Sequence, residues 1–232
     1  MTDIVHYTLD NRIAVIRMDD GKANALSVEM IDGLVAALTR AEGEASAAVL
    51  IGRTDRFCAG FDLRVMMSGP EQAKALLGRG SELLLRLYGA TLPLVVACTG
   101  HAMAGGALVV LTGDTRIGAH GAFKLGLNEV QIGLPVPVLA MEFARSRLTA
   151  AELTRATLFA QIYAPEDAVR AGYLDQVVAA DALLDTAKAE AARLGALAAS
   201  AYRATKLRLR GPVIADIKAR MVEDMRTLMN PA

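Results

Sequence analysis

Two glycine turns are the segments most able to do chemistry through their main chain. Gly105-Gly106 lies where a buried apolar segment passes into an apolar helix. Amides at a helix start have no partner within the helix and lie at the positive end of its dipole, so they attract an oxyanion. In Ala59-Gly60-Phe61, glycine allows backbone angles that aim the next amide inward. Two amides converging on one carbonyl oxygen would form an oxyanion hole. Alternatively, both turns serve only tight packing, because neither is a specific motif by itself.

The histidines and cysteines suggest no metal centre. His6, His101 and His120 share no metal-ligand spacing with each other or with Cys58 and Cys98. Both cysteines lie in apolar segments, and we expect them to be buried, reduced and without a disulfide role. The sequence also contains no nucleophile elbow and no phosphate-binding Gly-x-x-x-x-Gly-Lys loop.

Composition narrows the possible partners. The 232 residues carry 25 basic and 25 acidic side chains, so neither nucleic acid nor an anionic membrane is an expected partner. Although 53% of the residues are hydrophobic, no apolar run approaches the roughly 20 residues that span a bilayer. The first residues lack a basic region followed by an apolar run, so we expect no signal peptide and a cytoplasmic location. With 4% aromatic residues and no Trp, the core must be aliphatic.

The periodicity predicts an α/β fold. Residues 13–18 are typical of an edge or hairpin strand, and Ser27 is expected to cap a helix over 28–42. Residues 47–51 and 94–98 are short continuous apolar runs, which indicates a parallel sheet covered on both faces.

Helical spacing marks the other elements. A helix is expected from about Ser81 to Gly89, because Gly78 and Gly80 weaken an earlier start, and another over 107–111. Short β and α elements then alternate to about residue 178. From residue 182 the pattern is helical, and Gly211-Pro212 is expected to break it in two. These patterns predict a core over 1–180 that carries the site and a helical region over 181–232 that packs on the core or on another subunit.

Three ordered blocks resemble the signature blocks of the crotonase (enoyl-CoA hydratase/isomerase) superfamily. They are Lys22-Ala23-Asn24-Ala25-Leu26, the segment from Phe57 to Leu63, and the segment from Gly100 to Gly106 followed by Asp114. The resemblance covers nearly the whole chain. It implies a spiral of ββα units, an acyl-CoA thioester substrate, and C-terminal helices that build a homotrimer or a dimer of trimers.

The resemblance also implies roles for individual residues. The amides of Phe61 and Gly105 would bind the thioester oxygen, with Gly60 and Gly106 completing the two turns. CoA would lie along a set of mainly backbone positions: Lys22, Ala23, Ala25, Ala59, Asp62 and Leu63. Lys22 is either a ligand of a CoA phosphate or a solvated turn residue, and Lys206 is a further candidate for such a phosphate. No separate cofactor is expected, because CoA is part of the substrate.

The carboxylates decide which reaction the resemblance implies. Hydratases of the superfamily have two glutamates, and the first falls at the position of Leu108, which cannot move a proton. The second falls at Glu129, in a block from Leu127 to Pro137 that looks most like the mitochondrial-type Δ3,Δ2-enoyl-CoA isomerases. This favours a 1,3 proton shift in which Glu129 takes a proton from C2 and returns it at C4. We expect apolar neighbours such as Val130, Leu134 and Leu108 to raise the pKa of Glu129.

Other functions stay open at this point. One is an enoyl-CoA hydratase or another lyase or hydrolase of the same superfamily, with a further acid or base elsewhere in the chain. Another is a noncatalytic subunit that binds acyl-CoA or RNA. Asp114 is expected to bond backbone locally rather than to act in the site.

Overall fold

The computed structural model describes residues 4–229 and shows a chain organised around two sheets. The larger sheet has six strands in the order β1-β2-β3-β5-β7-β9, and every pair except β1-β2 is parallel. The smaller sheet has three parallel strands in the order β4-β6-β8. The strands are β1 (Val5–Asp10), β2 (Ile13–Met18), β3 (Ala47–Ile51), β4 (Asp55–Cys58), β5 (Leu94–Cys98), β6 (Gly100–Met103), β7 (Thr115–Ala119), β8 (Leu125–Gly126) and β9 (Gln176–Val178).

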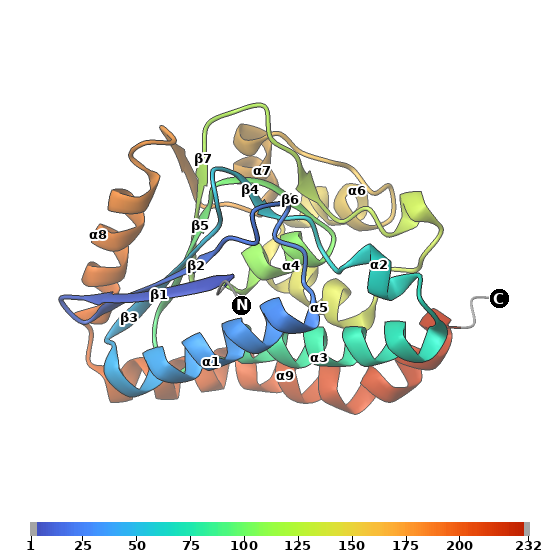
Figure 1. Cartoon of the computed structure of the whole chain (residues 1–232), viewed down its shortest axis with the longest axis horizontal. Helices are drawn as coiled ribbons and strands as arrows, with labels where there is room; N and C mark the ends of the chain where they lie inside the picture. The colour runs from blue at the N-terminus through green and yellow to red at the C-terminus, as the bar shows by residue number, and fades with distance from the viewer. Residues whose placement is uncertain (1–3, 230–232) are drawn as a thin grey trace.

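The chain repeats a β-β-α unit, as the resemblance implied. β3 and β4, β5 and β6, and β7 and β8 each place one strand in the large sheet and the next in the small one, and helices follow each pair. Successive units therefore stack side by side into a spiral (Figure 1). The helices are α1 (Val28–Glu44), α2 (Leu63–Met66), α3 (Pro70–Tyr88), α4 (Gly105–Thr112), α5 (Val138–Arg147), α6 (Ala150–Thr157), α7 (Pro165–Ala171), α8 (Leu183–Gly195) and α9 (Ala199–Met229), with a 3₁₀ turn η1 (Val130–Ile132).

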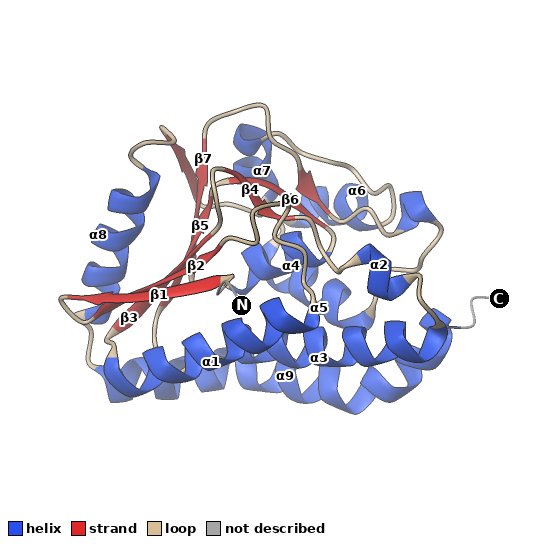
Figure 2. Ribbon diagram, viewed as in Figure 1, coloured by secondary structure: helices blue, strands red, loops and turns tan. Residues whose placement is uncertain are grey.

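Helices cover both faces of the large sheet, which is why its central strands are continuously apolar (Figure 2). Alternate residues such as Val49 and Val95 pack with Leu183 and Ala187 of α8, whereas Ala48 and Leu50 join the main core beneath α1 and α3. The predicted parallel sheet is therefore confirmed. The boundary near residue 180 stays a prediction, although α8 covers part of the sheet. Among residues 4–229, no helix combines the length and apolarity needed to cross a bilayer.

Two predicted helix limits are wrong. α3 begins at Pro70 rather than near Ser81, and Gly80 lies inside it. A Cβ at Gly80 would come within 2.1 Å of the Phe61 ring, so glycine is there for close packing and does not mark a helix end. α9 also continues through Gly211-Pro212. Proline removes only one hydrogen bond of the helix, and packing of α9 on α3 and α5 holds the two halves in line.

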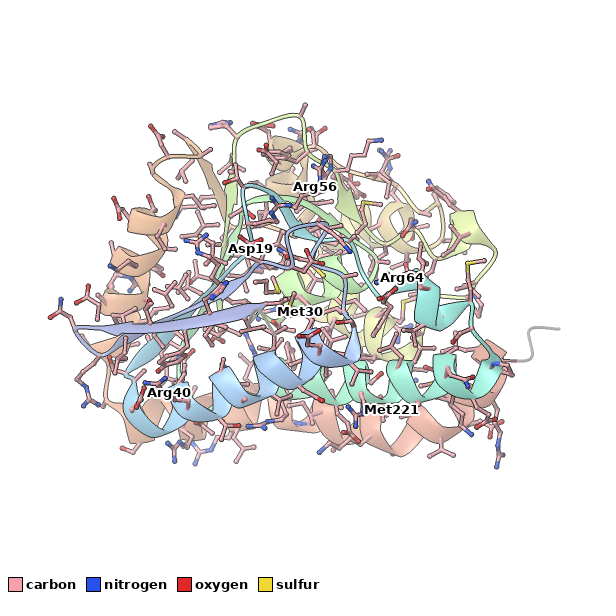
Figure 3. All side chains as sticks on the ribbon, viewed as in Figure 1. Asp19, Met30, Arg40, Arg56, Arg64 and Met221 are labelled. Carbon is pink, nitrogen blue, oxygen red and sulfur yellow. The ribbon has the colours of Figure 1, made fainter. Side chains whose placement is uncertain are left out.

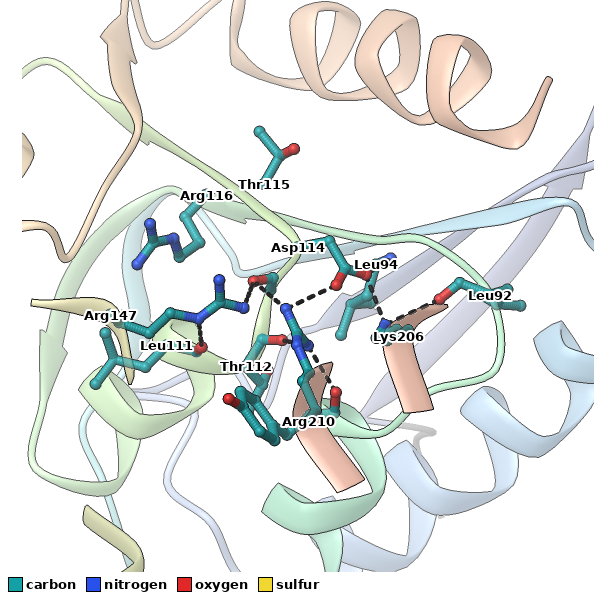
Figure 4. A network of polar contacts seen from close by, with 12 residues as sticks. Leu92, Leu94, Leu111, Thr112, Asp114, Thr115, Arg116, Arg147, Lys206 and Arg210 are labelled. Carbon is teal, nitrogen blue, oxygen red and sulfur yellow. Dashed lines mark hydrogen bonds and ion pairs between the residues drawn. The ribbon is translucent and has the colours of Figure 1, made fainter. Parts of the chain in front are cut away.

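A buried ionic cluster fastens α9 to the core (Figure 4). Asp114 accepts from Lys206 Nζ at 2.6 Å, pairs with Arg210 Nη2 at 2.7 Å, and accepts from the Leu94 amide at 2.8 Å. The expectation of a purely local role for Asp114 is therefore wrong, since its partners come from distant segments. Lys206 is also excluded as a ligand for a CoA phosphate, because it is buried and bonded to Asp114 and to the Leu92 carbonyl.

Candidate active site

The Phe61 amide is oriented by a bridge between the turn after β4 and the segment before α1. The Leu26 amide donates to the Gly60 carbonyl at 2.8 Å, and the Asp62 amide donates to the Leu26 carbonyl at 3.3 Å. Successive peptide groups of an extended segment point in opposite directions, so the Phe61 N–H between them points away from Leu26. Within residues 4–229 it donates to no backbone carbonyl.

The Gly105 amide lies at the first turn of α4. Helix geometry leaves such an amide without a partner inside its own helix, at the positive end of the helix dipole. Ala104, which precedes it, has φ 47° and ψ −119°, a conformation that favours glycine. This strain fixes the direction in which the helix starts, and strain of this kind gathers at functional sites. Ala104 is also tied to the small sheet, because its amide donates to the Gly126 carbonyl at 3.0 Å.

The two glycine turns lie against each other. A Cβ at Gly60, whose φ is +97°, would come within 3.3 Å of the Gly105 nitrogen. A Cβ at Gly106 would lie 1.9 Å from the Cys58 carbonyl oxygen, and one at Gly105 would lie 3.2 Å from the Phe61 ring. The glycines therefore allow tight packing between the two turns, which places the Gly60 backbone next to the Gly105 nitrogen. An oxyanion hole shared by the Phe61 and Gly105 amides stays a prediction.

Two of the residues predicted to lie along CoA are hydrogen-bonded to each other at the turn after β4. The Ala59 amide donates to the Ala23 carbonyl at 3.0 Å. Lys22, Ala59 and Leu63 are exposed, and Ala23 and Ala25 are half-buried. The Lys22 side chain is in solvent, while its carbonyl accepts from Arg53 at 2.8 Å.

Asp62 has a structural task that the resemblance did not indicate. Its Oδ1 accepts from the Arg64 amide at 2.9 Å and so caps α2, and its Oδ2 pairs with the Arg64 guanidinium at 3.2 Å. Figure 3 labels Arg64 on α2. The hydrogen bond from the Arg64 side chain lowers the pKa of Asp62. This carboxylate is therefore ionised and engaged, and it is unsuited to act as a proton acceptor.

Asn24 is a residue that sequence reasoning did not place in the site. It is fully buried, and its Nδ2 lies within hydrogen-bond distance of the carbonyls of Met18, Arg56 and Phe57. It therefore ties the turn that carries Ala23 to the end of β4. The signal was its position within the first matched block, where a buried amide between two alanines fits a structural clamp.

Glu129 is linked to this junction through the small sheet. It lies three residues after Gly126, whose carbonyl accepts from the amide of Ala104, the residue before Gly105. The residue is 8% exposed, and its Oε2 is buried without a hydrogen-bond partner among the described residues. Glu129 thus has the properties of a general base: its carboxylate is buried and forms no ion pair with the described residues.

Burial raises the pKa of Glu129, and the contact with its own amide opposes this only in part. The expected direction is therefore confirmed, but two of the expected causes are not. Val130 and Leu134 are 43% and 36% exposed, whereas Leu108 is 4% exposed. An apolar Leu108 in the first turns of α4 supplies neither an acid nor a base to the site.

Among residues 4–229, no three side chains of His, Cys, Asp or Glu gather as metal ligands. A groove of about 560 Å³ runs between α3 and α9, lined by Lys74, Gly78, Met221, Met225 and their neighbours, and it contains none of the predicted site residues.

Comparison with known proteins agrees with this geometry. The family model described as enoyl-CoA hydratase/isomerase matches residues 8–229. The chain belongs to the enoyl-CoA hydratase/isomerase family. A member of this family from Pseudomonas syringae has a solved structure that superposes with a TM-score of 0.95 at 37% identity, covering 98% of this chain and 99% of the other. The predicted spiral fold is confirmed.

Relatives of both activities resemble this family member. Human mitochondrial enoyl-CoA delta isomerase 1 is 33% identical over 203 residues, which are 85% of this chain and 67% of the human protein. A probable enoyl-CoA hydratase from Rhodobacter capsulatus is 31% identical over 204 residues, which are 87% of this chain and 79% of that protein. The chain thus spans about two thirds of the human isomerase's length, and similarity establishes the family without choosing between isomerase and hydratase.

Proposed function

We propose that this protein is a Δ3,Δ2-enoyl-CoA isomerase in which Glu129 is the only base. Glu129 would take a proton from C2 of a 3-enoyl thioester, and the released electron pair would form a dienolate whose oxygen is held by the Phe61 and Gly105 amides. The protonated Glu129 would then return the proton at C4, leaving the double bond between C2 and C3. Both half-reactions use one carboxyl group, so no second acid is needed.

The observation that carries this proposal is the buried Leu108 in the first turns of α4, together with the buried carboxylate of Glu129, whose Oε2 has no hydrogen-bond partner among the described residues. Water addition to a 2-enoyl thioester needs a group that activates water and a group that protonates the α-carbon. A leucine does neither. A base that both takes and returns the proton works best with a pKa near the operating pH, and burial raises the pKa of Glu129 toward that value.

The remaining roles are proposed with it. CoA enters as part of the thioester, with no separate cofactor, and lies along Lys22, Ala23, Ala25, Ala59 and Leu63. A homotrimer or hexamer, a cytoplasmic location and a role in fatty acid metabolism stay predictions. Light scattering on the purified protein tests the assembly, and cell fractionation tests the location.

The deciding experiment compares wild type with Glu129→Gln on 3-enoyl-CoA and 2-enoyl-CoA substrates side by side. Positioned acid-base catalysis contributes about 10²–10⁴-fold, so we expect kcat for isomerisation to fall by that factor with little change in KM. Glu29→Gln, an exposed residue in the first turn of α1, is the matched control and is expected to keep full activity. Isomerisation at the wild-type rate by Glu129→Gln would refute the proposal.

Hydratase activity is the second candidate, and the similarity to the Rhodobacter capsulatus protein favours it. Rapid hydration of 2-enoyl-CoA by the wild type, without conversion of 3-enoyl-CoA, would establish it. A second acid or base would then have to lie outside the position of Leu108.

A further inference from the structure

Three buried polar atoms without partners belong to Glu129, to its neighbour Asn128 and to Tyr173, whose pKa the charge of Glu129 affects. Glu129 Oε2, Asn128 Oδ1 and the Tyr173 hydroxyl are each buried and form no regular hydrogen bond within residues 4–229. Buried polar groups are nearly always satisfied, by protein or by ordered water, so such a group calls for an explanation. Tyr173 is the least expected of the three, because it lies 44 positions after Glu129 (173 − 129) and is 0% exposed.

The fold places Tyr173 close to the segment that carries Glu129. Tyr173 follows α7 and Gly172, which ends that helix in the left-handed conformation. Its ring lies 5.6 Å from the ring of Tyr163, and Tyr163 exchanges two backbone hydrogen bonds with Leu125 of β8 at 2.9 and 3.0 Å. Glu129 lies four residues beyond Leu125, and the amide of Leu127, between them, faces the phenol oxygen of Tyr173.

The electrostatics agree with this placement. Burial is the main cause that raises the pKa of Tyr173, the neighbouring Tyr163 adds to it, and the negative charge of Glu129 raises it further. The Leu127 amide faces the phenol oxygen and acts in the opposite direction, although it is not placed as a regular hydrogen bond. The phenol is therefore neutral at every ordinary pH, its oxygen faces an N–H group, and its own hydrogen is available to an acceptor.

The neighbouring phenol provides the contrast. The Tyr163 hydroxyl donates to Glu152 Oε2 of α6 at 2.9 Å, and Arg155 of the same helix also acts on it. Its donor is thus used away from Glu129. Of these two adjacent tyrosines, only Tyr173 has a hydroxyl that no described residue accepts from and a pKa that the charge of Glu129 raises.

We propose that Tyr173 is a positioning residue for Glu129, whose hydroxyl donates through one buried water molecule to Glu129 Oε2. The water would accept from the phenol and donate to the carboxylate, which satisfies both orphaned atoms. Tyr173 does not reach the substrate, because it is completely buried. Its effect is to hold one carboxylate oxygen in place, so that the other faces the substrate, and to favour the ionised form that accepts a proton. The inference rests on the proposed role of Glu129 as the base.

The test measures the pKa of Glu129 directly. Wild type, Tyr173→Phe and Tyr163→Phe are labelled with ¹³C at the glutamate carboxyl carbon and titrated by NMR, with Glu129→Gln identifying the resonance. Tyr173→Phe keeps the buried ring and removes only the donor, so we expect the pKa of Glu129 to rise by about one unit, the size expected when an ionised carboxylate loses a hydrogen bond. Tyr163→Phe is expected to leave it unchanged. An equal pKa in Tyr173→Phe and wild type would overturn the inference.

A reciprocal measurement does not depend on how well Tyr173→Phe folds. In wild-type protein labelled with ¹³C at the tyrosine ζ carbon, the Tyr173 resonance should shift as Glu129 titrates, and the shift should vanish in Glu129→Gln. No shift would also overturn the inference.

Turnover separates this inference from the proposed function. If the protein isomerises 3-enoyl-CoA, the acidic limb of its kcat/KM profile, which reports the free enzyme, should move to higher pH by the same amount in Tyr173→Phe. A shifted Glu129 pKa in a protein that does not isomerise would refute the proposed function and leave the contact between Tyr173 and Glu129 established.

Discussion

Replacement of Gly106 with alanine tests the oxyanion hole through the spacing of its backbone. A Cβ at this position would lie 1.9 Å from the Cys58 carbonyl oxygen, whereas real Cβ atoms essentially never approach a neighbour closer than 3.0 Å. The helix start and the end of β4 must therefore separate by about 1 Å, since 3.0 − 1.9 = 1.1 Å. The neighbour is backbone rather than the flexible end of a side chain, so the shift is passed to the turns that carry the two amides.

That displacement sets the expected loss. A misplacement of about 1 Å can cost roughly 10²-fold in rate, and removal of one oxyanion donor costs about 10²–10³-fold. We therefore expect kcat/KM for 3-enoyl-CoA to fall at least about 10²-fold in Gly106→Ala. Because the amides act on the charge that develops at the thioester oxygen, kcat should carry most of the loss.

The assay is steady-state isomerisation of 3-enoyl-CoA, with thermal unfolding recorded on the same samples. Gly78→Ala is the control, because a Cβ at Gly78 of α3 meets no atom within 4 Å and alanine favours a helix. This control is expected to be fully active and slightly more stable. A folded Gly106→Ala protein with wild-type kcat/KM would show that the spacing of these turns does not govern the reaction.

Two further predictions concern stability. Burial raises the folded-state pKa of Glu129 above its ordinary value of 4.5, so its ionised form costs stability at neutral pH and this cost disappears below pH 4.5. Glu129→Gln should therefore unfold at a higher temperature than wild type at pH 7 and lose that advantage at pH 4; an equal or lower melting temperature at pH 7 would contradict it. Asp114→Asn leaves the buried Lys206 and Arg210 without their carboxylate and should cost about 3–5 kcal/mol in urea unfolding. Glu223→Gln, which breaks the exposed pair with Arg226, should cost at most about 1 kcal/mol, and similar losses in the two variants would show that the buried cluster is not what holds α9.

Local patterns identified most elements because the signals are short-range. The continuous apolar runs at 47–51 and 94–98 became central parallel strands, and Ser27 caps α1 through its hydroxyl, which accepts from the Met30 amide. The glycines were less informative. A glycine that ends a helix and a glycine that admits a neighbouring ring are the same letter, so the start of α3 at Pro70, well before Gly80, could not be seen without Phe61 beside that glycine.

The polar residues show the same limit. Glu129 could be proposed as the base from the block around it, but its desolvation could not, because the expected neighbours Val130 and Leu134 face outward. Lys206 could not be told from a solvated helix lysine, because its partner Asp114 lies 92 residues away in the chain. Tyr173 carried no signal at all, since it lies 44 residues after Glu129 in the chain and only the fold shows that its hydroxyl is buried without a partner.

The sequence alone therefore determined the family, the ββα order, the leucine at position 108 and the glutamate at position 129. Each of these depends on residue identity and on spacing along the chain. Only the tertiary structure decided which glycine turns lie against each other, which carboxylates are already engaged and which buried atoms lack a partner. Those properties depend on distances between segments that are far apart in the chain, and it is the packing of the glycine turns and of α9 that fixes them.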